Sequence, residues 1–103
     1  MTKRTKALAI SKEVKARVWE RDHGYCIICG TADASPNAHY IARSQGGLGI
    51  EENIVTLCTR CHYEFDFGKK RVEYSLYIRD YLMSKYPYWN DDNLIYRKEV
   101  KSC

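Results

Sequence analysis

The sequence predicts a small α+β fold in which a strand, a long loop, a second strand and a helix are held together by a metal site. The first observation is that four cysteines form two C-x-x-C pairs, Cys26 with Cys29 and Cys58 with Cys61. Four thiolates in two close pairs are what a tetrahedral structural zinc site requires. The second is that two short segments with strand character lie between the pairs, separated by a glycine-rich stretch.

Length and composition narrow the class of protein. The 103 residues predict one domain, residues 1–103, and at this size burial alone gives a modest margin of stability. No apolar run is long enough to cross a membrane and the N-terminal segment lacks the apolar core of a signal peptide, so we expect a cytoplasmic protein. In that reducing compartment, paired cysteines are expected to bind metal rather than form disulfides. The net charge of +4 weakly favours a polyanionic partner.

The N-terminal part is predicted to be a basic arm followed by a helix. Residues 1–10 are expected to be a short polar arm, either a solvated tail or a segment that lies along phosphates. Its basic side chains are Lys3, Arg4 and Lys6. Ser11 can cap a helix that runs to about Asp22, with Val14 and Val18 in its buried stripe.

The middle of the chain is predicted to be a hairpin with a long loop. Residues 37–41 are short and contain an aromatic and a β-branched residue, which predicts a strand with Asn37, His39 and Ile41 on the same side. Residues 43–52 carry three glycines and are expected to form an irregular loop. Residues 54–57 then predict a second strand, antiparallel to the first.

Two helices and an aromatic segment are predicted to complete the chain. Residues 60–67 are expected to form a short helix, and Gly68 to break it. Residues 69–85 predict a longer helix that Pro87 stops, and residues 86–103 an irregular wrap over the core. The apolar residues near helical spacing in the longer helix are Val72, Leu76, Ile78 or Arg79, and Leu82 or Met83. The predicted parts are the arm 1–10, the core 11–67 and the C-terminal part 68–103.

The motifs between residues 11 and 67 resemble those of a known family. They are Cys26-x-x-Cys29, Ala38-His39-Tyr40-Ile41, Arg43-Ser44-Gln45-Gly46-Gly47, Glu52-Asn53-Ile54-Val55 and Leu57-Cys58-x-x-Cys61-His62. A histidine, an asparagine and a histidine in this order within a C-x-x-C frame are similar to the zinc-containing HNH endonucleases of the His-Me finger superfamily. The chain resembles in particular the small HNH proteins that phages and prophages encode.

This resemblance implies a ββα-metal fold with flanking helices and hydrolysis of DNA phosphodiester bonds. It gives His39 the role of general base, His62 that of a metal ligand and Asn53 an orienting role. The expected partner is DNA in a bacterial host cell, and small phage HNH proteins can also work beside a terminase or another packaging protein.

The side chains themselves suit this chemistry. A neutral histidine can take a proton from water at neutral pH, and one divalent cation can stabilise the charge that develops on phosphate oxygens. His62 and Asp66 have the i, i+4 spacing that two ligands on one helix face need, so they are the candidate ligands for Mg²⁺, Mn²⁺, Ni²⁺ or Zn²⁺. Arg43 and the basic arm are candidate phosphate contacts, which would give affinity with low sequence specificity.

Several alternatives stay open. Ala38 stands where the family commonly has a ligating Asp or His, which puts the coordination of the catalytic metal in doubt. Asp66 could be a solvated surface carboxylate, and His62 a ligand of the structural zinc. A register with His39 as ligand and Tyr40 as base is disfavoured, because a tyrosine with a pKa near 10 is a poor base. A catalytically inactive nucleic-acid-binding or phage-complex interaction module is the competing function.

Overall fold

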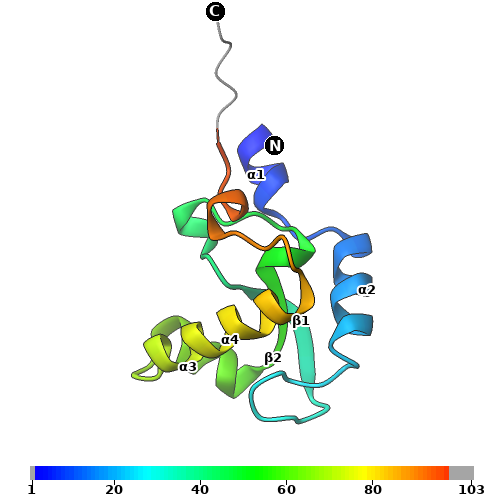
Figure 1. Ribbon diagram of the computed structural model, residues 1–103, viewed down its shortest axis with the longest axis vertical. Coiled ribbons are helices and arrows are strands. Elements are labelled where there is room, and N and C mark those ends of the chain that lie inside the picture. The colour runs from blue at the N-terminus through cyan, green and yellow to red at the C-terminus, as the bar shows by residue number, and fades with distance from the viewer. Residues whose placement is uncertain (1, 98–103) are drawn as a thin grey trace, which may run out of the picture.

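The computed structural model describes residues 2–97, so residues 98–103 of the predicted wrap lie outside the described part. A two-stranded antiparallel sheet of β1 (Ala34–His39) and β2 (Ile54–Cys58) lies between helix layers (Figure 1). Helix α2 (Lys12–Arg21) packs on one side, and α3 (Thr59–Phe67) with α4 (Arg71–Lys85) packs on the other. The predicted α+β fold, a hairpin followed by a helix with flanking helices, is confirmed.

Strand β2 is the centre of the core because both of its faces are buried. Ile54 packs against α2 through Val14 and Val18, whereas Val55 and Leu57 belong to the core shared with α3 and α4. Alternation along a strand produces this two-sided burial.

Strand β1 begins earlier than predicted and contains an irregularity. Ala34 pairs with Cys58, and the ladder resumes with Ala38 opposite Val55 after a register shift. Pro36 lies within the shift, where a residue without an N–H group interrupts no ladder bond. The periodicity predicted residues 37–41 because it did not anticipate a bulge around the proline.

The N-terminal segment is a helix rather than the expected polar tail. Helix α1 (Lys3–Leu8) is capped by the Thr2 hydroxyl, which accepts from the Thr5 N–H group at 3.1 Å. Leu8 at its end is only 2% exposed, and its burial fixes the helix to the body of the protein. The Gly49 N–H group donates to the Ala7 carbonyl at 3.0 Å and joins α1 to the glycine-rich loop.

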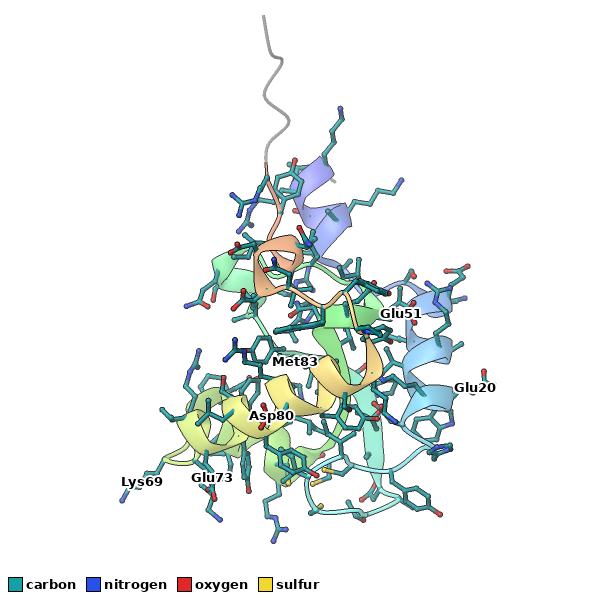
Figure 2. The ribbon with its side chains drawn as sticks, in the orientation of Figure 1. Glu20, Glu51, Lys69, Glu73, Asp80 and Met83 are labelled. Carbon is teal, nitrogen blue, oxygen red and sulfur yellow. The ribbon has the colours of Figure 1, made fainter. Side chains whose placement is uncertain are left out.

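Helix α4 buries part of the predicted stripe. Ile78 and Leu82 are fully buried, whereas Val72 and Leu76 are exposed. Met83, also predicted as an alternative to Leu82, projects outward (Figure 2). Ile78 and Leu82 pack in one core with Phe65 and the sheet. Partly buried tyrosines, rather than Val72 and Leu76, pack against this core.

The segment after α4 covers the glycine-rich loop. It contains a short 3₁₀ helix, η3 (Asp91–Leu94), whose Leu94 is buried. The Leu48 N–H group donates to the Leu94 carbonyl at 2.7 Å, and the Tyr96 N–H group donates to the Gly46 carbonyl at 2.7 Å. These bonds join the C-terminal segment to the glycine-rich loop.

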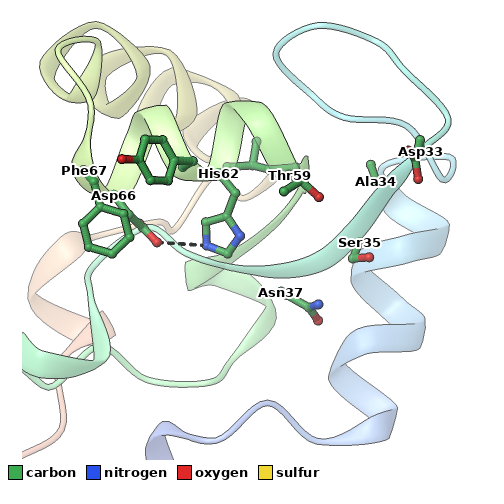
Figure 3. Close-up of a pocket in the computed structure, with 10 residues that line it drawn as sticks. Asp33, Ala34, Ser35, Asn37, Thr59, His62, Asp66 and Phe67 are labelled. Carbon is green, nitrogen blue, oxygen red and sulfur yellow. Dashed lines mark ion pairs between the residues drawn. The ribbon is translucent and has the colours of Figure 1, made fainter.

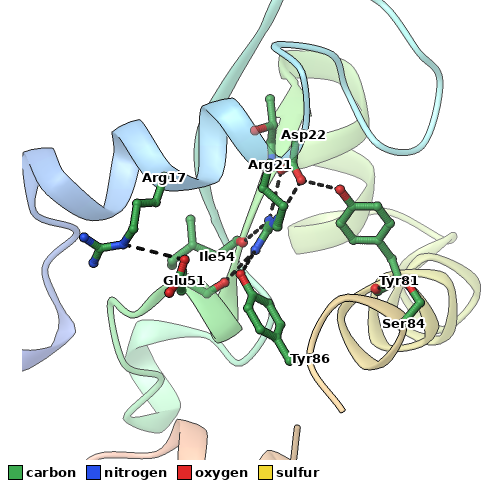
Figure 4. Close-up of polar contacts among 9 residues, drawn as sticks. Arg17, Arg21, Asp22, Glu51, Ile54, Tyr81, Ser84 and Tyr86 are labelled. Carbon is green, nitrogen blue, oxygen red and sulfur yellow. Dashed lines mark hydrogen bonds and ion pairs between the residues drawn. The ribbon is translucent and has the colours of Figure 1, made fainter. Parts of the chain in front are cut away.

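A buried ion pair joins three layers of the fold (Figure 4). Arg21 and Asp22 pair at 2.8 Å, with side chains 11% and 0% exposed. Asp22 also accepts from the Thr56 N–H group at 2.9 Å and from the Tyr81 hydroxyl. Arg21 donates to the backbone carbonyls of Glu51 and Ile54, at 2.8 and 2.7 Å. The pair therefore connects α2 to β2 and α4.

We expect Asp22→Ala to lower the free energy of unfolding by about 3–5 kcal/mol, because it leaves the Arg21 charge buried without its partner. Tyr81→Phe removes one hydrogen bond to the same carboxylate and should cost about 1 kcal/mol. Urea unfolding followed by circular dichroism measures both. Equal costs for the two variants would contradict a dominant role for the ion pair.

Candidate functional site

The four cysteines of the two C-x-x-C pairs meet in one cluster. The Sγ atoms of Cys26, Cys29, Cys58 and Cys61 all lie within 4.8 Å of one another, and those of Cys29 and Cys58 are 3.6 Å apart. Zinc–sulfur bonds of about 2.3 Å in a tetrahedron place sulfur atoms about 3.8 Å apart. In each pair, the N–H group of the second cysteine points at the sulfur of the first, at 3.5 and 3.4 Å. This is the geometry of a structural zinc site.

The ionisation of the thiols also fits a bound cation. A backbone hydrogen bond at Thr31 lowers the pKa of the Cys29 thiol to about 7. Burial raises the pKa of the Cys61 thiol to about 12, and the charge of Cys26 adds to this effect. Thiolates this close repel one another, so all four ionise at neutral pH only when a cation neutralises them.

The cluster also sets the position of α3. Cys58 is the N-cap of α3, and Cys61 lies buried in its first turn. His62 follows directly and is outside the cysteine cluster, so it faces a different side of the helix. Its Nε2 atom lies 3.1 Å from the Oδ2 atom of Asp66. Asp66 is thus paired with His62.

The distance between these two atoms suits joint coordination of a metal. Two neighbouring ligands of an octahedral ion, each about 2.1 Å from the metal, lie about 3.0 Å apart. His62 and Asp66 line an open pocket of about 470 Å³ that has room for further ligands. The pair therefore offers one nitrogen and one oxygen donor beside free space.

His39 lies in the same pocket and is held by α1. Its Nε2 atom is 2.9 Å from the Leu8 carbonyl oxygen. Since a carbonyl can only accept, Nε2 carries the proton and Nδ1 keeps its lone pair in the neutral ring. Burial lowers the pKa of His39 from its ordinary value of 6.5, the Leu8 hydrogen bond opposes this, and the Arg43 charge reinforces it. His39 is therefore neutral at pH 7.

Asn53 lies outside this pocket and is fully buried. Its amide oxygen accepts from the Ile41 N–H group at 2.8 Å, and its amide nitrogen donates to the carbonyls of Ile41 and Leu48, at 3.2 and 2.8 Å. These bonds close the loop between the strands at both ends. Because Ile41 is two residues beyond His39, Asn53 fixes the end of the strand that carries His39.

Gly49 extends this support to α1. A Cβ atom at Gly49 would lie 2.1 Å from the Ala9 carbonyl oxygen and 3.0 Å from the Leu8 carbonyl oxygen. Only glycine permits this close approach of two backbones. The loop that Asn53 closes thus supports the carbonyl that orients His39.

Two arginines face the pocket of His39 and His62. Arg43 lies in the short 3₁₀ helix η1 (Arg43–Gln45), and Arg71 opens α4. The Arg71 guanidinium donates to the Asp66 carbonyl at 3.2 Å, which holds it at the edge of the pocket. Together they supply positive charge beside the two histidines, as a phosphate ligand requires.

The structure brings some predicted site residues together and separates others. His39, His62, Asp66 and Arg43 line one pocket, as does Asn37. The basic residues of α1 are exposed outside the pocket, on the helix that ends at Leu8. They are Lys3, Arg4 and Lys6.

Two residues beside His39 in the sequence point elsewhere. Ala38 is fully buried in the core. The Tyr40 ring packs edge-on against Trp89, with centroids 5.7 Å apart, and contributes nothing to the pocket. The register with Tyr40 as base therefore has no support in the geometry.

Arg71 and the Leu8 carbonyl are site groups that the sequence reasoning missed. Arg71 is one of three basic residues in a Lys-Lys-Arg run, so its residue type does not single it out. Its position shortly after Gly68 was the sequence signal available for its role. The Leu8 carbonyl has no sequence signal, because every residue has a backbone carbonyl.

These features define a ββα domain: a hairpin and a following helix, joined by a zinc-type cysteine cluster, with histidines from strand and helix in one pocket. Residues 26–64 match the model of the family described as HNH endonuclease. The chain contains an HNH endonuclease family domain over these residues.

A similar protein is anaredoxin of Nostoc sp. (strain PCC 7120 / SAG 25.82 / UTEX 2576). It is 31% identical over 49 residues, which are 47% of this chain and 64% of that protein. The similarity thus spans less than two thirds of that relative. Within residues 2–97, no helix has the length and apolar character needed to cross a membrane.

We expect Gly49→Ala to release His39 from Leu8, because the new Cβ would collide with the Ala9 carbonyl. The protected Nε2–H signal of His39 should disappear from ¹⁵N-edited NMR spectra, and overpacking should cost about 1–3 kcal/mol of stability. Gly30→Ala is the control for general destabilisation: its Cβ would meet nothing within 4 Å, but its φ of 80° strains any side chain, so it should lower stability and keep the His39 signal. A His39 signal that survives in Gly49→Ala would contradict this account of the loop.

Proposed function

We propose that this protein is a metal-dependent endonuclease that hydrolyses DNA phosphodiester bonds. The observation that carries the proposal is the single pocket in which a neutral His39, the His62–Asp66 pair and two arginines face one another. The HNH endonuclease family match over residues 26–64 supports the same reaction.

In the proposed mechanism, His39 accepts a proton from the attacking water at Nδ1. The Leu8 carbonyl holds the ring in the tautomer that leaves this atom free. A lowered pKa keeps the ring unprotonated at neutral pH, as a general base requires. Asn53 acts as a positioning residue, through the strand end that it fixes.

Arg43 and Arg71 would hold the phosphate against His39 and neutralise its non-bridging oxygens. A divalent cation bound by His62 and Asp66 would stabilise the developing negative charge and the departing oxygen. Mg²⁺, Mn²⁺, Ni²⁺ and Zn²⁺ are the candidates. Asn37, which lines the pocket with both residues, offers an amide oxygen as a further donor.

DNA would approach along the basic face of α1, since this helix leads to His39 through Leu8. Contacts from Lys and Arg to the phosphate backbone carry no sequence information, so the proposed enzyme has low sequence specificity. A phage terminase or packaging partner rests on the sequence resemblance alone.

A non-catalytic DNA-binding module is the second candidate, and the buried Ala38 favours it. Among residues 2–97, the cysteine quartet is the only cluster of three or more His, Cys, Asp and Glu ligands, so the proposed catalytic ion has two such ligands. Such a module would bind DNA without cutting it in any metal.

Plasmid nicking tests the proposal. We expect cleavage with added Mg²⁺, Mn²⁺ or Ni²⁺, and a loss of about 10²–10⁴-fold in rate for His39→Ala, as removal of a general base gives. His62→Ala should lose cleavage as well. Zinc content is measured for every variant, so that loss of the fold is not mistaken for loss of catalysis.

His23→Asn is the matched control for these histidine variants. His23 is exposed, lies outside the pocket and has a φ of 57°, which asparagine tolerates. Undiminished nicking by His39→Ala, or no nicking by the wild type in any metal, would reject the proposed mechanism.

Removing basic residues from α1 should weaken DNA binding and reduce its dependence on salt. Lys3→Ala with Lys6→Ala is expected to lower the slope of log K against log salt by about 0.9 for each phosphate that the variant no longer neutralises. Fluorescence anisotropy of labelled DNA over a salt series measures this slope. Arg79→Ala with Lys85→Ala removes the same charge from exposed positions of α4, and an equal effect of the two pairs would exclude a specific role for α1.

A further inference from the structure

A second pocket lies beside the first and shares its wall. It has a volume of about 290 Å³ and lies between β1 and α3 (Figure 3). His62 and Asp66 project from α3 toward the strand, with Asn37 and Ser35 across from them. His62, Asp66, Asn37 and Phe67 line both pockets, so the two form one continuous groove.

Two exposed aromatic rings border this second pocket. Tyr63 is 61% exposed and Phe67 is 76% exposed, and their ring centroids are 5.5 Å apart. They follow His62 and Asp66 by one residue each, so α3 presents a polar i, i+4 pair with an aromatic pair next to it. Large apolar side chains gain nothing in stability from such exposure, and exposed rings in a polar groove are typical of surfaces that bind bases by stacking.

The two pockets differ in charge, and this difference indicates which part of a nucleotide each pocket suits. Asp66 lines both pockets, but only the first also holds arginines, Arg43 and Arg71, which suit a phosphate. The second is lined by Asp33 at one end and by the hydroxyls of Ser35 and Thr59. A carboxylate repels phosphate but accepts hydrogen bonds from the exocyclic amines of bases, and hydroxyls can bond any base edge.

We propose that the second pocket binds an unpaired nucleobase next to the phosphate that is cut, with Phe67 and Tyr63 stacking on it. This inference rests on the proposed nuclease function and names its preferred substrate, which is single-stranded or locally unpaired DNA. A base held in a duplex reaches the pocket only after it is unpaired and unstacked, which costs free energy. Fully paired DNA is therefore the poorer substrate.

Binding and cleavage test the pocket separately. Single-stranded oligonucleotides that carry 2-aminopurine report stacking as quenched fluorescence, measured with the 103-residue chain and no added divalent metal, so that the DNA is not cut. We expect Phe67→Ala to weaken binding about tenfold, within the range for one base–aromatic contact, and to lose the quenching. Phe67→Tyr should retain both.

Two further variants separate the pocket from general effects. Ser35→Tyr fills the pocket from the strand side and should abolish quenching as Phe67→Ala does. Leu76→Ala removes an exposed apolar side chain of α4 that lines neither pocket and should change nothing. Cleavage rates on single-stranded and fully paired DNA are then compared for the same proteins.

The outcomes distinguish this inference from the nuclease proposal. A wild type that cuts single-stranded DNA faster, with this preference lost in Phe67→Ala, supports both. Cleavage with no quenching and the same preference in every variant overturns the base pocket and leaves the nuclease standing. Quenching that depends on Phe67, without cleavage in any metal, supports the pocket and rejects the nuclease.

Discussion

The convergence of four cysteines is the constraint on which the rest of this small domain depends. The cluster joins the turn at Cys26 to the start of α3 at Cys58 and Cys61, and these segments are distant in the sequence. A bound zinc would fix the first turn of α3 directly. His62 directly follows Cys61 in α3. The cysteine cluster therefore sets the direction of the His62 ring, although His62 is not one of its ligands.

The position of His39 depends on a different set of contacts, in which backbone groups predominate. Asn53 bonds the backbone at Ile41 and Leu48, and the loop between them meets α1 at Gly49. The Leu8 carbonyl then bonds the ring. The two histidines are thus placed by separate structures, the metal cluster for one and the loop with α1 for the other. Their meeting in one pocket depends on the hairpin that joins both structures.

Sequence patterns predicted the hairpin, the helix that follows it and the clustering of the cysteines, because each has a local signal of spacing or periodicity. The i, i+4 spacing of His62 and Asp66 likewise anticipated their 3.1 Å contact. Sequence patterns failed where contacts between distant segments determine which residues are buried. The burial of Leu8 attaches α1 to the body of the protein. On α4, partly buried tyrosines rather than Val72 and Leu76 complete the buried stripe. Arg71 reached the pocket through the packing of α4 on α3.

The hydrogen bond from His39 to the Leu8 carbonyl shows that the site depends on residues beyond the matched family segment. The segment recognisable as the family domain is residues 26–64, and both Leu8 and Arg71 lie outside it. A transplant of the hairpin and helix into another scaffold would carry every signature residue, yet it would lack a carbonyl to hold the imidazole. The recipient would have to provide that oxygen from its own backbone.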